Sequence, residues 1–82
     1  MSSLPAISGR DLIKLLRKDG WEIQRSARHG VALTKRFPDK KRVTVVPTRS
    51  TPLAPGTLSA ILGAKQTGMG RNGLEKLIKE SG

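Results

Sequence analysis

The fold is decided by residues 8–46, which read SGRDLIKLLRKDGWEIQRSARHGVALTKRFPDKKRVTVV. Leucine and isoleucine recur at helical spacing over residues 8–19, with charged residues on the other side, and this pattern predicts an amphipathic helix. Ser8 is a suitable N-cap for that helix, and Gly20 can adopt the left-handed conformation that ends it.

Three strands are expected after this helix. Residues 21–26 alternate as a strand does, residues 29–36 carry spaced apolar side chains, and residues 42–46 are rich in β-branched residues. Pro38 and Asp39 favour a turn between the second and third segments. Together the segments predict an antiparallel meander. In its first strand, one face is expected to carry Trp21, Ile23 and Arg25, and the other Glu22, Gln24 and Ser26.

The remaining sequence predicts a proline-rich loop and two helices. The loop covers residues 47–55, and its last proline suits the first turn of a helix that stops near Gly63. Residues 66–73 contain three glycines and predict a flexible linker. Asn72 and Glu75 have the spacing of a capping pair, which would open a short terminal helix.

This order of elements predicts an α+β fold with the helices on one face of a three-stranded antiparallel sheet. The other face of the sheet is left free and is the natural place for a ligand. We expect a single domain over residues 1–82, with a core at about residues 8–64 and a C-terminal extension at about residues 65–82.

The composition indicates a polyanionic partner. Sixteen Lys and Arg residues stand against six Asp and Glu residues, which gives a formal net charge of +10. Such a chain concentrates near phosphate backbones, so nucleic acid is favoured over acidic proteins or membrane surfaces. The chain has no Cys and one His, which excludes disulfide scaffolds and Cys-based zinc sites. We expect no metal and no cofactor.

The sequence also predicts a cytoplasmic protein that does not enter the membrane. The longest uncharged run, residues 50–64, is interrupted by Pro52, Pro55 and Gly56 and is not a spanning segment. Residues 1–9 are too short and too polar for a signal peptide.

Seven basic residues between positions 25 and 42 are the candidate phosphate ligands, with Asp39 the one acid among them. They are Arg25, Arg28, Lys35, Arg36, Lys40, Lys41 and Arg42. The alternative is that these side chains only solvate the sheet. Trp21 and Phe37 are the only aromatic residues, so we expect RNA to be bound by its backbone and shape more than by base stacking.

His29 is the candidate catalytic residue, because its side chain changes charge near neutral pH. A neutral imidazole can take the proton from a ribose 2′-OH, and neighbouring Arg and Lys side chains can stabilise charge on the phosphoryl oxygens. The alternative is that His29 is an ordinary contact. In a regular strand it would share a face with apolar Val31 and Leu33, so either Gly30 marks a bulge or His29 precedes the strand.

The chain resembles the HicA (YcfA-like) family of mRNA interferase toxins over roughly residues 8–64. The matching features are GRDLIKLLRKDGW (residues 9–21), Arg25 four residues later, a histidine at the start of the next strand, the Pro38-Asp39 turn, VTVVP (residues 43–47), and PGTL (residues 55–58) followed by Ile61 and Leu62. Where the family commonly has Gly-Ser-His, this chain has Ala27-Arg28-His29-Gly30.

The resemblance implies a double-stranded-RNA-binding-domain-like fold and a ribonuclease that acts on mRNA, with a histidine of the second strand as the essential catalytic residue. It also implies neutralisation by an acidic HicB-type antitoxin. We therefore predict a toxin-type, metal-independent endoribonuclease that uses His29. Two alternatives stay open: a nucleic-acid-binding module without catalysis, and a protein whose basic face serves only to bind an acidic subunit.

Overall fold

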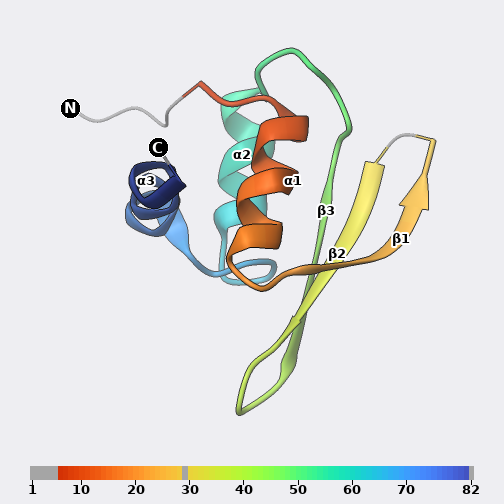
Figure 1. Ribbon diagram of the computed structural model, residues 1–82, viewed down its shortest axis with the longest axis vertical. Coiled ribbons are helices and arrows are strands. Elements are labelled where there is room, and N and C mark those ends of the chain that lie inside the picture. The colour runs from red at the N-terminus through yellow and green to blue at the C-terminus, as the bar shows by residue number, and fades with distance from the viewer. Residues whose placement is uncertain (1–5, 29, 82) are drawn as a thin grey trace.

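The computed structural model describes residues 6–28 and 30–81 (Figure 1). Its elements are α1 (Gly9–Lys18), β1 (Glu22–Ala27), β2 (Gly30–Arg36), β3 (Lys41–Val46), α2 (Pro55–Leu62) and α3 (Gly70–Ser81). The predicted α+β fold is confirmed. Within the described residues, no helix combines the length and the apolar character needed to cross a membrane.

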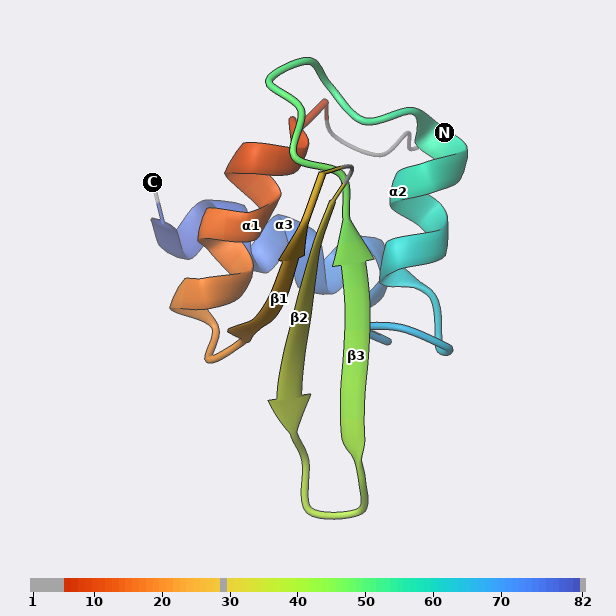
Figure 2. The ribbon, with the colours of Figure 1, turned by 90° about the vertical axis from the view of Figure 1, so that its right-hand side faces the viewer.

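The strands form one antiparallel sheet in the order β1-β2-β3, as the predicted meander requires. Figure 1 shows α1 and α2 packed on one face of this sheet, and Figure 2 looks onto the other, open face. Leu33 of β2 and Val46 of β3 point into the helical side and are fully buried. The apolar core therefore lies between the sheet and the helices.

Helix α1 begins and ends where the sequence predicts. The Ser8 hydroxyl accepts a hydrogen bond from the Asp11 backbone N–H at 3.1 Å, which satisfies one of the free donors of the first turn. Gly20 has a φ of 100°, a conformation that favours glycine, and it turns the chain toward β1. Leu12 and Leu16 are fully buried, so the predicted apolar stripe faces the core.

The expected parity of β1 is wrong. Ile23 pairs with Leu33, but Arg25 pairs with Ala32, so Gln24 is an extra residue in a β-bulge. Directly paired residues lie on the same face of a sheet, and Leu33 and Ala32 lie on opposite faces. The bulge therefore places Arg25 on the opposite face from Ile23, which is the open face of the sheet.

The terminal helix starts earlier than predicted. Helix α3 begins at Gly70, and its early i to i−4 hydrogen bond runs from the Gly73 N–H to the Met69 carbonyl at 3.2 Å. Asn72 is therefore already inside the first turn, and the predicted capping pair of Asn72 and Glu75 is wrong.

The glycine-containing segment before α3 is held against the core and does not behave as a separate linker. The buried Thr67 hydroxyl donates to the Ile61 carbonyl at 2.8 Å, and the Gly68 N–H donates to the Gly63 carbonyl at 2.8 Å. Leu74 of α3 is fully buried in the core. Figure 1 shows α3 on the side of α1 and α2 away from the sheet, so it leaves the open face uncovered.

Candidate nucleic-acid interface

The open face of the sheet has an apolar centre and a basic border. Paired rows of residues follow from the strand register. They are Arg25, Ala32 and Val45; Glu22, Thr34 and Val43; and Arg36 with Lys41. Val43 and Val45 are 41% and 57% exposed, which is high for large apolar side chains. These two valines lie among polar and charged side chains, so a partner that covers this face would bury apolar surface.

The basic border is concentrated at the hairpin that joins β2 and β3. Arg36, Lys40 and Lys41 are all exposed there, and Figure 2 shows this hairpin extending beyond the helices. Arg25 lies nearer the other end of the sheet, because it pairs with Ala32. Four of the seven predicted phosphate ligands are thus accessible on the open face or at its hairpin.

Lys35 and Arg42 lie on the helical face instead. The Lys35 ammonium donates to the Asp19 carbonyl oxygen at 2.6 Å and pairs with the Asp19 carboxylate at 3.2 Å. The Arg42 guanidinium donates to the carbonyls of Ala64 and Gln66 at 2.7 and 3.3 Å. These two side chains, predicted as phosphate ligands, already have partners within the chain.

Lys35 and Arg42 both contact the ring of Phe37, which packs against Trp21. The Lys35 Nζ and the Arg42 guanidinium carbon lie 5.4 and 5.6 Å from the centre of the Phe37 ring, which are cation–π distances. Trp21 packs edge-on against Phe37 with 6.2 Å between ring centres, and it is buried. Because Trp21 is buried, its ring is not available to stack on an RNA base.

The turn between β1 and β2 carries the remaining predicted residues. Arg28 is exposed in this turn, and the buried Gly30 begins β2. His29, the predicted catalytic residue, lies outside the described residues. Among the described pairs of β1 and β2, the bulge is in β1 between Ile23 and Arg25, not at Gly30.

Arg49 lies at the same end of the sheet as Arg28. Arg28 and Arg49 both line a cleft of about 480 Å³ between the β1–β2 turn and the loop that precedes α2. Arg49 is not among the residues predicted from the sequence, because it stands seven positions beyond the dense basic stretch and in a proline-rich loop. The turn and this loop lie at the same end of the sheet in both ribbon views (Figures 1 and 2).

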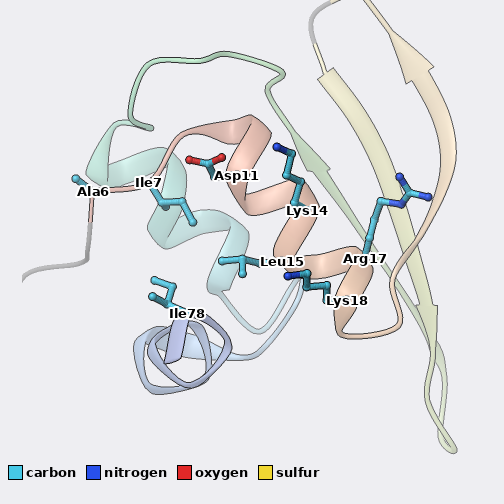
Figure 3. Close-up of a pocket in the computed structure, with 8 residues that line it drawn as sticks. All are labelled: Ala6, Ile7, Asp11, Lys14, Leu15, Arg17, Lys18 and Ile78. Atoms are coloured by element: carbon cyan, nitrogen blue, oxygen red, sulfur yellow. The ribbon is translucent and has the colours of Figure 1, made fainter. Parts of the chain in front are cut away.

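Another hollow lies away from this cleft, in a groove of about 650 Å³ beside α1 (Figure 3). Ile7, Leu15 and Ile78 form its apolar part, and charged side chains of α1 surround it. Among the described residues, no three side chains of His, Asp or Glu come together as a metal site would require.

Comparison with known proteins identifies the family. A sequence model for the HicA toxin of bacterial toxin–antitoxin systems matches residues 9–69, which is more than half of the chain. The chain belongs to the HicA toxin family. Neither the search of curated proteins nor the search of solved structures finds a match.

The HicA match covers both the open face and the cleft. It runs from the start of α1 to the residue before α3. The groove of Figure 3 depends on Ile78, which lies beyond the matched residues. As a member of a family of toxin–antitoxin toxins, this HicA chain has an antitoxin as its kind of partner.

Proposed function

We propose that this HicA-family toxin is an endoribonuclease that binds mRNA in the cytoplasm through the open face of its sheet and cleaves it with His29. The observation that carries the proposal is the basic border of that face, which leaves Arg25, Arg36 and Lys41 exposed within a matched toxin family. Arginine and lysine supply the charge that attracts the RNA backbone, and the planar guanidinium can bond two phosphate oxygens.

The reaction would be an internal phosphoryl transfer. His29 takes the proton from a ribose 2′-OH, and the 2′-oxygen forms a bond to the adjacent phosphorus. The bond from phosphorus to the 5′-oxygen of the next nucleotide breaks, and that oxygen takes a proton from water and leaves as a 5′-OH. The other product ends in a 2′,3′-cyclic phosphate. Basic side chains near the reacting phosphate stabilise the charge on its oxygens.

The same face suits the antitoxin. We propose an acidic HicB-type antitoxin that covers Val43 and Val45 with apolar side chains and meets the surrounding cations with carboxylates. The net charge of +10 favours an acidic partner. Covering the open face would exclude RNA and neutralise the toxin.

The test compares wild type with His29→Ala on an RNA oligonucleotide in buffer that contains EDTA. We expect the variant to lose about 100-fold or more of the cleavage rate while RNA affinity changes by less than about threefold. Wild-type products should end in 2′,3′-cyclic phosphate. Equal cleavage rates for the two proteins would contradict the proposed role of His29.

A binding module without catalysis is the second candidate, because Ala27-Arg28-His29-Gly30 departs from the Gly-Ser-His that the family commonly carries. In that case wild type and His29→Ala bind RNA equally, binding weakens steeply with salt, and neither protein cuts the chain. The cleavage assay therefore separates the two candidates.

A further inference from the structure

We infer that the cleft between the β1–β2 turn and the loop before α2 binds one phosphate of the RNA backbone, next to the bond that is cut. The inference deepens the proposed function and rests on it for the identity of the ligand. The phosphate ligands would be Arg28 and Arg49, with the hydroxyls of Thr48, Thr51 and Thr57 as further donors.

The lining of the cleft has the chemistry of an anion site. Its other described residues are prolines, a leucine and an alanine, and none is Asp or Glu. A phosphate there would meet two positive charges and three hydroxyl donors with no opposing carboxylate. Hydroxyl and guanidinium groups are among the usual partners of nucleic-acid phosphates.

Within the described part of the chain, both arginines are available to a ligand. Arg28 and Arg49 are exposed. The ion pairs among the described residues are Lys35 with Asp19 and Arg71 with Glu75, so neither arginine is engaged in one. This distinguishes them from Lys35 and Arg42, whose charged groups already bind carbonyl or carboxylate oxygens.

The backbone of the loop is held in place by the start of α1. The Arg10 N–H donates to the Arg49 carbonyl at 3.2 Å, and the Leu53 N–H donates to the Ile7 carbonyl at 2.8 Å. Gly9 lies close to Pro47, and a Cβ at Gly9 would overlap the Pro47 carbonyl oxygen. Because these contacts order the loop before any ligand arrives, binding costs less conformational entropy.

The position of Arg28 connects the cleft to catalysis. Arg28 immediately precedes His29 in the chain. A phosphate held by the Arg28 side chain would therefore fix the RNA close to the proposed catalytic residue. Holding a substrate in this way lowers the entropic part of the reaction barrier.

The first experiment measures affinity for a short single-stranded RNA at several salt concentrations. We expect Arg49→Gln to weaken binding about tenfold. The slope of the logarithm of the binding constant against the logarithm of the salt concentration (the salt slope) should fall in magnitude by about one. Arg49→Lys keeps the charge without the planar fork and should recover only part of the affinity. The matched control is Arg17→Gln, which removes the same charge from the exposed side of α1 and should change affinity by less than about threefold.

The second experiment needs no RNA and titrates the ¹⁵N-labelled protein with inorganic phosphate at constant ionic strength. We expect saturable amide shifts at Thr48, Arg49, Thr51 and Thr57, and their loss in Arg49→Gln. Shifts spread over all basic surfaces, or equal RNA affinities for Arg49→Gln and Arg17→Gln, would overturn the inference. If the protein shows saturable shifts in the cleft but neither binds nor cuts RNA, the cleft is an anion site and the proposed function is contradicted.

Discussion

Lys41 and Arg42 are neighbours with the same charge, yet they lie on opposite faces of one sheet. Lys41 is exposed on the open face, whereas the Arg42 guanidinium binds two carbonyls of the segment that leads to α3. Val45 and Val46 differ in the same way, at 57% and 0% exposure. Adjacent residues of a strand alternate between faces, so the same side chain serves folding in one position and is available for binding in the next.

The largest difference between the faces should appear in the two valines. Val46→Ala removes methyl groups from the core and should lower the free energy of unfolding by about 2 kcal/mol. Val45→Ala makes the same change on the open face and should stay within about 0.5 kcal/mol. Denaturant unfolding of the two variants measures both values. Equal losses would show that the open face is covered in the free protein.

Substitutions of Arg42 and Lys41 should affect different properties, with Arg42 contributing to stability and Lys41 to RNA binding. Arg42→Gln leaves the Ala64 and Gln66 carbonyls without a charged donor, and we expect a loss of about 1 kcal/mol in the free energy of unfolding. Lys41→Gln should leave stability within about 0.5 kcal/mol and reduce the salt slope of RNA binding by about one. Thermal unfolding and RNA titration of both variants make the comparison. The open-face assignment fails if Arg42→Gln reduces the salt slope and Lys41→Gln does not.

The smallest effect concerns charge on the open face. Glu22 pairs with Thr34 and is the one acidic residue among the described positions of that face. Removing its repulsion toward phosphate in Glu22→Gln should tighten RNA binding about twofold at low salt, since exposed charges interact weakly. Glu80→Gln on α3 is the matched control and should change affinity less. The same gain in both variants would mean that net charge, not the face, sets the affinity.

Sequence reasoning predicted the elements better than their faces. The leucine spacing of α1 and the β-branched run of β3 are local signals, and both elements lie within about one residue of the predicted positions. The face of Arg25 was mispredicted, because a bulge adds a residue that no local pattern marks. The start of α3 was mispredicted, because Asn72 has a capping residue's chemistry but lies inside a helix that begins at Gly70.

Part of the candidate site can also be predicted from the sequence, and part depends on contacts between distant segments. His29 and the basic stretch from residue 25 to 42 are visible in the sequence, because composition alone makes a single imidazole and a charge cluster conspicuous. The role of His29 stays a prediction. That Lys35 and Arg42 have partners inside the chain, and that Arg49 lines a cleft with Arg28, depends on contacts between segments far apart in sequence.

The order of helices and strands, the strongly basic character and the family resemblance can all be predicted from residue type and local spacing. Which of the described cations have partners inside the chain depends on the three-dimensional packing. This is set by the register of β1 against β2, by the packing of the segment before α3 on β3, and by the loop held by α1. Those contacts are non-local, and a side chain's neighbours across the sheet cannot be inferred from its neighbours along the chain.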